Sequence, residues 1–273
     1  LINLDIIKNI ILMLKKSFQN LTIFSNFTGN PIGQNVEEGV EVYNASGCDG
    51  VIALGGGSGL DVGKAIAFMC NQSRPLWDFE DIGDYWTRAD SSKISKIIAV
   101  PTTAGTGSEV SRAAVIILAS GEKRIIFSPN LIPDISILDP ELTVGLPPFL
   151  TAATGMDAIT HCIEAISSPK INASADAIGA SALKDALCDG ALMKAVKNGE
   201  DLDARSTMLS VSTRGGMAFS KGLGAVHAMS HACGKDEDLR LHHGTLNAVI
   251  LPTVLKFNSE FLGDKLSLIR AAI

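Results

Sequence analysis

The pattern of the chain changes at Leu146-Pro147-Pro148, and this change constrains the fold more than any other feature. Before it, short apolar runs alternate with helical patterns, and the runs at residues 50–54 and 94–100 are typical of strands buried on both faces. The sequence therefore predicts an α/β domain over residues 1–145 and an all-helical domain over residues 146–273. The helical patterns of the second domain cover residues 149–167, 173–197, 203–218, 223–231 and 246–257.

A mostly parallel sheet is predicted for the first domain, because its strands alternate with helices. Residues 113–119 and 123–127 flank Ser120-Gly121-Glu122 and predict a hairpin. The other elements expected here are strands at residues 21–24 and 134–138 and helices at residues 6–18, 35–46 and 61–69. The chain starts at Leu1 rather than Met and stops within a helical pattern, so we expect a fragment of a longer protein.

Composition excludes several classes of function. Hydrophobic residues make up 46% of the 273 residues and charged residues 19%, which supports a sizeable core. The net charge is −6 without a long basic run, so we expect no nucleic-acid partner. No uninterrupted apolar stretch is long enough for a bilayer, so we expect no membrane partner. The five cysteines form no CxxC pair, which favours reduced thiols and a cytoplasmic protein.

A glycine-rich turn follows the strand predicted at residues 50–54. Its sequence is Leu54-Gly55-Gly56-Gly57-Ser58-Gly59-Leu60-Asp61-Val62-Gly63-Lys64. Glycines let the backbone approach a pyrophosphate, and a helix N-terminus offers unpaired N–H groups and a positive dipole end. Ser58 and Asp61 fit a capping box. The GxGxxG spacing is not met, so the turn alone is equally compatible with an ordinary strand-to-helix connection.

A second polar loop strengthens the prediction of a nucleotide site. The strand at residues 94–100 ends in Pro101-Thr102-Thr103-Ala104-Gly105-Thr106-Gly107-Ser108-Glu109. This loop also follows the C-terminal end of a strand, where open α/β sheets bind ligands. Its hydroxyl groups and glycines suit contacts to a dinucleotide.

All five histidines lie in the helical half, between residues 161 and 243. Asp157 and His161 are four residues apart on a predicted helix, so they share one face, and His227 and His231 repeat this spacing. An aspartate with several imidazoles suits Fe²⁺ or Zn²⁺ and does not distinguish them. By spacing alone, His231 and His242 are each open as a ligand, a proton relay or a spectator. Glu164, one turn after His161, is more typical of a solvated or outer carboxylate than of a ligand.

Together these segments resemble the iron-containing (group III) alcohol dehydrogenase family. The resemblance spans most of the chain and is most specific in the histidine motifs. It is carried by residues 55–64, 101–108, 133–140, 155–164, 224–231, 243–244 and 247–248. It implies a Rossmann-like N-terminal domain and an all-α C-terminal domain, with the active site in a cleft between them.

The resemblance also implies roles for individual residues. It implies metal ligation by Asp157, His161, His227 and His243. It places His231 near the substrate and Lys123 near the ribose or nicotinamide. The dinucleotide contacts that it implies are Gly56, Gly57, Ser58, Asp61, Thr102, Thr103 and Thr106.

Two departures from the family pattern stand out. The segment at residues 235–242 is about two residues longer than in many relatives, which leaves His242 and His243 as alternatives for the fourth ligand. His243 is preferred because it directly precedes Gly244, as in the family motif. The chain also lacks the family's first strand–helix unit, where an acidic residue helps to choose NAD over NADP, and its last helices.

The expected activity is the reversible oxidation of a small alcohol to an aldehyde or ketone with NAD or NADP. Fe²⁺ is expected ahead of Zn²⁺ through the resemblance, and His231 is the expected proton relay. Alternatives are a dehydroquinate-synthase-like lyase, a glycerol-dehydrogenase-like zinc enzyme, or an inactive nucleotide-binding paralogue. The resemblance also admits a homodimer, which no residue pattern in the chain indicates.

Overall fold

The computed structural model describes residues 3–27, 29–234 and 241–273, and the chain forms two compact units. Unit 1 comprises Leu1–Pro101 and Arg112–Ile137, and unit 2 comprises Thr102–Ser111 and Leu138–Ile273. This division differs from the expected boundary near residue 145 in two places. It falls after Ile137, and it assigns the threonine-rich loop to the helical unit.

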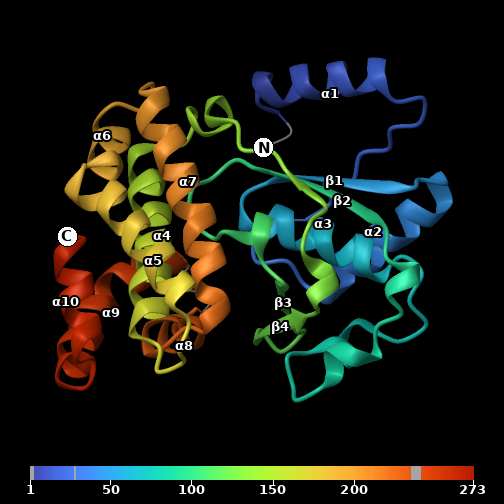
Figure 1. Cartoon of the computed structure of the whole chain (residues 1–273). Helices are drawn as coiled ribbons and strands as arrows, with labels where there is room; N and C mark the ends of the chain where they lie inside the picture. The colour runs from blue at the N-terminus through green and yellow to red at the C-terminus, as the bar shows by residue number, and fades with distance from the viewer. Residues whose placement is uncertain (1–2, 28, 235–240) are drawn as a thin grey trace. The chain divides into compact units, whose positions relative to one another are not determined.

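Unit 1 is built on a three-stranded parallel sheet with the strand order β1-β2-β5. Its strands are β1 (Gly50–Gly55), β2 (Lys96–Pro101) and β5 (Ile135–Ser136), and Gly50 is paired with Lys96. The predicted parallel sheet is therefore confirmed. In Figure 1, α2 (Gly33–Ser46) and α3 (Gly57–Met69) lie below β1 and β2, and α1 (Asp5–Ser17) lies above them.

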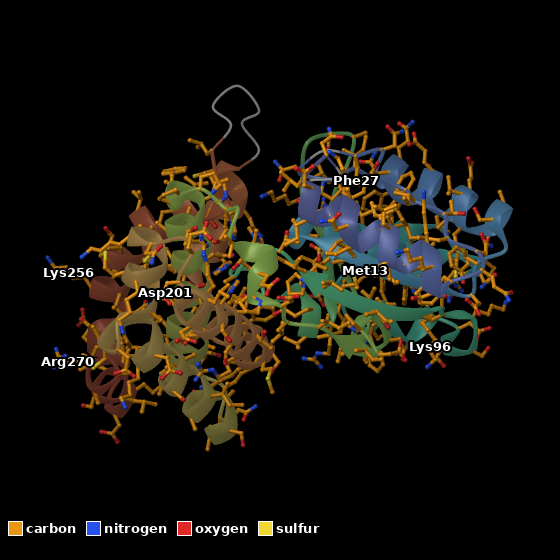
Figure 2. All side chains as sticks on the ribbon, turned by 90° about the horizontal axis from the view of Figure 1, so that it is seen from above. Met13, Phe27, Lys96, Asp201, Lys256 and Arg270 are labelled. Atoms are coloured by element: carbon orange, nitrogen blue, oxygen red, sulfur yellow. The ribbon has the colours of Figure 1, made fainter. Side chains whose placement is uncertain are left out.

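Helix α3 approaches strand β1 very closely. A Cβ built on Gly63 would lie 2.5 Å from the Cβ of Ala53, so this contact depends on a glycine in the helix. Val62, Phe68 and Phe79 belong to the buried apolar cluster beneath the sheet. On the other side of the sheet, α1 passes in front of the strands in Figure 2. Met13 on this helix is 66% exposed.

The predicted hairpin is confirmed as the antiparallel pair β3 (Ala113–Ile117) and β4 (Lys123–Phe127). Residues 21–24, in contrast, form no strand although their sequence is β-branched and apolar. Phe24 instead packs against the core from an irregular segment. A strand needs a hydrogen-bonding neighbour, and the pattern of one segment does not reveal whether that neighbour is present.

Unit 2 is helical, with α4 (Pro148–Ser167) packed against α5, α6, α7 and α9. Helix α4 lies at the centre of unit 2. Since 13 of its 20 residues are buried, little of its surface faces solvent. The helix expected at residues 173–197 is interrupted by a π-helical turn at Lys184–Cys188 and by Gly190, whose φ is +74°. The remaining helices are α5 (Ala173–Leu183), α6 (Ala191–Lys197), α7 (Leu202–Ala218), α8 (Ala225–Cys233), α9 (His243–Asn258) and α10 (Asp264–Ala271).

None of the helices in the described part of the chain combines the length and the apolar character that crossing a bilayer requires. All five cysteines are free thiols.

Candidate metal centre and nucleotide-binding loops

Four side chains from three helices meet inside unit 2. Asp157 and His161 lie one turn apart on α4, His227 lies on α8, and His243 is the first residue of α9. Asp157, His161 and His227 are 4%, 5% and 3% exposed, so this polar cluster is withdrawn from water. Helix α9 begins at His243, three residues before the start of the helical pattern at residues 246–257.

Three imidazole nitrogens point at one carboxylate oxygen. The Oδ1 atom of Asp157 lies 3.7 Å from Nε2 of His161, 3.4 Å from Nε2 of His227 and 3.5 Å from Nε2 of His243. The rings of His161 and His227 stack with their centroids 4.6 Å apart. The structure therefore brings together all four residues predicted as ligands, with His243 Nε2 3.5 Å from Oδ1 of Asp157.

Asn247 lies one turn after His243 on α9 and is fully buried in this cluster. Its Nδ2 atom donates to Asp157 Oδ1 at 2.8 Å, and lies 3.3 Å from His227 Nε2 and 3.2 Å from His243 Nε2. One donor thus stands where several acceptor atoms converge. Sequence reasoning matched Asn247 to the family but gave it no role, although its i, i+4 spacing from His243 repeats that of Asp157 and His161.

Charge in the cluster is unevenly distributed. Burial acts most strongly on Asp157, but the three imidazoles outweigh it and hold the pKa of Asp157 well below its usual range. Burial lowers the pKa of His161 to about 4, against the attraction of Asp157. Burial also opposes protonation of His227, but Asp157 and Glu164 outweigh it and raise the pKa of His227 to about 9. The cluster thus favours one buried positive charge next to Asp157.

This donor set fits a divalent transition metal. One carboxylate oxygen and three imidazole nitrogens are ligands typical of Zn²⁺ and Fe²⁺, and here each Nε2 lies within 3.7 Å of Oδ1 of Asp157. Asp157, His161 and His227 offer ligand atoms within 4.8 Å of one another. A divalent ion supplies the positive charge that the buried carboxylate requires.

His231 lies beside the predicted ligands His227 and His243. It is half-buried on α8, and its ring centroid is 5.0 Å from that of His243 and 6.0 Å from that of His227. An imidazole in this position, beside the cluster, is suited to accepting or passing on a proton. His242 is the residue before α9, and the preceding residues 235–240, where the longer segment was noted, lie outside the described residues.

The glycine-rich turn of unit 1 leads directly into helix α3. The helix begins at Gly57 with Gly56 as its N-cap residue, so Ser58 lies in the first turn. The capping box expected from Ser58 and Asp61 is therefore wrong, because the helix begins earlier than the polar pattern indicated. Ser58 Oγ instead accepts the N–H of Asn30 at 3.4 Å.

Asp61 and Lys64 on α3 connect the helix to the hairpin. Asp61 Oδ2 accepts the N–H of Val115 at 2.9 Å, and Lys64 Nζ donates to the carbonyl of Ala113 at 2.6 Å. Lys64 is fully buried and lies 3.9 Å from Asp61 Oδ1. Lys123, the other predicted cofactor contact of unit 1, is half-buried at the first position of β4.

The threonine-rich loop, Thr102–Ser111, is held by helices α4 and α7 of unit 2. Gly107 has a φ of +61°, and a Cβ there would lie 2.6 Å from the Cα of Gly216 on α7. Thr213, also on α7, donates to Glu109 Oε1 at 2.7 Å. Thr102 is buried, whereas Thr103 and Thr106 are half-buried. The three predicted threonines therefore lie on a loop whose position is fixed by backbone contacts.

Comparison with known sequences decides the family. Residues 1–140 match the family described as "Iron-containing alcohol dehydrogenase", and residues 151–273 match "Fe-containing alcohol dehydrogenase family, C-terminal". This chain belongs to the iron-containing alcohol dehydrogenase family. The resemblance inferred from the sequence is thus confirmed, together with its α/β first domain and helical second domain.

Three relatives illustrate the match. The 4-hydroxybutyrate dehydrogenase of Cupriavidus necator is 45% identical over 243 residues, which are 88% of this chain and 63% of that protein. The NAD-dependent methanol dehydrogenase of Bacillus methanolicus is 34% identical over 96% of this chain and 69% of its own length. The crystal structure of the alcohol dehydrogenase ADH/D1 from an archaeal Red Sea brine pool source has a TM-score of 0.89 at 30% identity, over 98% of this chain and 68% of that one. The chain therefore spans a little under two thirds of the Cupriavidus necator protein.

Proposed function

We propose that this chain forms the metal- and nucleotide-binding part of an NAD(P)-linked oxidoreductase that interconverts a small alcohol and its aldehyde or ketone. The observation that carries the proposal is the convergence of three imidazoles on the buried Asp157, each Nε2 lying 3.4–3.7 Å from Oδ1. Membership of a family whose relatives are named as dehydrogenases supports the same reaction.

Asp157, His161, His227 and His243 would hold the metal, with Fe²⁺ favoured over Zn²⁺ by the family description. When bound, this ion supplies a Lewis acid that polarises the substrate oxygen, while nicotinamide supplies the hydride acceptor. The role of the four residues is to present their lone pairs from three packed helices, so that little reorganisation is needed on binding.

The cofactor contacts that we propose are Gly56, Gly57, Ser58, Asp61, Thr102, Thr103, Thr106 and Lys123. The start of α3 at Gly57 supports phosphate binding, because backbone N–H groups in its first turn have no partner within the helix. The choice between NAD and NADP belongs to this proposal. The printed name of the Bacillus methanolicus relative favours NAD.

Alcohol oxidation releases a hydride from carbon and a proton from oxygen, and these need separate acceptors. His231 is the proton acceptor that we propose, since its half-buried ring borders the four ligand residues, with its centroid 5.0 Å from that of His243. Small alcohols are the substrate class, by analogy with the names of the relatives. We further propose a cytoplasmic enzyme that has neither nucleic-acid nor membrane partners and that forms a homodimer.

Metal removal tests the function directly. The protein is dialysed against a strong chelator and assayed with NAD and with NADP over a series of short alcohols, with metal analysis of the same sample. We expect turnover to disappear with the metal and to return on addition of Fe²⁺ or Zn²⁺. Full turnover by protein shown to contain no metal would refute the proposal.

A further inference from the structure

The carboxylate of Glu164 joins α4 to the first turn of α8. Its Oε1 atom accepts the N–H of Val226 at 2.7 Å, and its Oε2 atom lies 2.6 Å from Nδ1 of His227 and 3.4 Å from the backbone N of His227. Glu164 is 5% exposed, so these contacts are made almost without water. Buried charge-assisted hydrogen bonds of this kind are among the strongest in proteins.

Gly224, the N-cap residue of α8, leaves space for this carboxylate. A Cβ built on Gly224 would lie 2.8 Å from Oε1 of Glu164, so a larger residue would displace the acid from the start of α8. Glu164 also follows Asp157 by seven residues and His161 by three, so α4 supplies two ligands and this acid along one side.

We infer that Glu164 is a positioning residue, which fixes the tautomer and the ring orientation of His227 so that Nε2 faces the metal. This inference rests on the proposed function, since it concerns the same metal centre. An ionised carboxylate only accepts hydrogen bonds, so Nδ1 of His227 keeps a proton, and a bound metal would take the lone pair of Nε2 in place of the proton that Nε2 otherwise carries. That lone pair is directed to the side of Asp157, whose Oδ1 is 3.4 Å away.

The other two imidazoles are oriented by weaker contacts. Nδ1 of His243 lies 3.3 Å from the hydroxyl of Ser230, and the His161 ring lies against Phe219 with a centroid distance of 4.9 Å. The contact of His227 with a charged acid is shorter than either. Together with Asp157, Glu164 also brings two negative charges to the centre, which match a divalent cation.

Glutamine is an informative replacement because it has the shape of glutamate. The glutamine of Glu164→Gln has one acceptor oxygen and one NH₂ group, so it cannot accept from both partners. Its NH₂ group must face either the backbone N–H of Val226 or Nδ1 of His227. Either the N–H of Val226 loses its acceptor, or Nδ1 becomes the acceptor and the proton moves to Nε2. The second outcome removes the lone pair that faces the metal.

The test measures the metal dissociation constant of the full chain by competition with a coloured chelator, using Co²⁺ as a spectroscopic probe and Zn²⁺. We expect Glu164→Gln to weaken both metals by about 10–100-fold and to alter the visible spectrum of Co²⁺. The matched control is Glu109→Gln, which removes another buried acid of unit 2 that accepts from Thr213. We expect the control to bind both metals within about twofold of the unaltered chain.

A second variant separates positioning from folding. Glu164 lines a cavity of about 350 Å³ that is also bordered by Ser168, Leu251 and Lys265. In Glu164→Ala, formate or acetate can enter from this cavity and occupy the place of the lost carboxylate. We expect either anion, but not chloride at equal ionic strength, to restore metal affinity and the Co²⁺ spectrum.

The outcomes are distinct. Unchanged metal affinity and an unchanged Co²⁺ spectrum in Glu164→Gln would overturn the positioning role while leaving the proposed function intact. If Glu164→Gln unfolds, the alanine variant in formate decides, and no gain in affinity there would overturn the inference. If the unaltered chain itself binds neither metal, the proposed function fails first.

Discussion

The two units use polar side chains in opposite ways. In unit 2, Asp157 and the imidazoles of His161, His227 and His243 face one another, so the candidate site is made of side chains. In unit 1, the side chains of Asp61 and Lys64 contact the hairpin, and the start of α3 offers backbone N–H groups. A metal needs directed lone pairs, whereas a phosphate can be bound by N–H groups that any residue supplies.

This difference affects how each unit responds to mutation. Side-chain replacements in the metal cluster should change ligand binding first. In unit 1, replacements of buried polar residues should change the free energy of unfolding first, because those residues connect α3 to β3.

The largest expected effect is the loss of metal from Asp157→Ala. The variant removes the carboxylate on which the three imidazoles converge, so we expect metal affinity to fall at least about a thousandfold, or about 4 kcal/mol. Metal content after dialysis measures this, with circular dichroism as a check on folding. Stoichiometric metal in the variant would contradict the expectation that side-chain replacements in the metal cluster change ligand binding first.

Next in size is Gly107→Ala, which tests how the threonine-rich loop is held. The new Cβ would lie 2.6 Å from the Cα of Gly216 at a φ of +61°, so we expect a loss of about 2–4 kcal/mol in the free energy of unfolding. Urea unfolding followed by circular dichroism measures it. The control is Gly190→Ala, which has a φ of +74° but no atom within 4 Å of its Cβ, and it should cost only about 1 kcal/mol.

Asp61→Asn sharpens the comparison within unit 1. Because Asp61 accepts the N–H of Val115, we expect Asp61→Asn to lower the free energy of unfolding by about 1–2 kcal/mol. If the dissociation constant for the dinucleotide changes less than about threefold at the same time, Asp61 leaves the set of proposed cofactor contacts. Tryptophan fluorescence reports unit 1, because Trp77 and Trp86 both lie in it. A tenfold weaker dinucleotide complex with unchanged stability would instead support Asp61 as a direct cofactor contact.

The smallest expected effect lies at the start of β2, where Figure 2 labels Lys96. Its Nζ atom lies 2.7 Å from Oδ1 of Asp134. Lys96 and the N–H of Ile97 lower the pKa of Asp134 below its usual 3.8, so the folded state binds this proton less readily than the unfolded state. The carboxylate therefore contributes stability above pH 3.8, and this contribution is lost as the pH falls further. Because both side chains are substantially exposed, Asp134→Asn should cost under about 1 kcal/mol at pH 7 and nothing at pH 2. Chemical unfolding at both values measures it, and an equal loss at pH 2 would rule out the charge as the cause.

The sequence was sufficient where a role depends on one periodic element. The spacing of Asp157 and His161 on one helix predicted their convergence, and the apolar runs before the two loops predicted β1 and β2. It was insufficient where a role depends on a distant partner. Residues 21–24 have a strand composition but no neighbouring strand, and no local pattern shows that Asp61 meets Val115 or that Glu164 meets His227 across 63 residues.

The threonine-rich loop also has a consequence for how this protein can be divided or recombined. Three peptide bonds connect the units, at Pro101–Thr102, Ser111–Arg112 and Ile137–Leu138. A single cut at residue 138 therefore does not release either unit intact. A chimera that exchanged only residues 138–273 with a homologue would join the Gly107 turn of one parent to the α7 surface of the other. Recombination that respects this architecture must transfer residues 102–111 together with the helical half. The unit that is transferred is therefore discontinuous in the gene, although it is continuous in space.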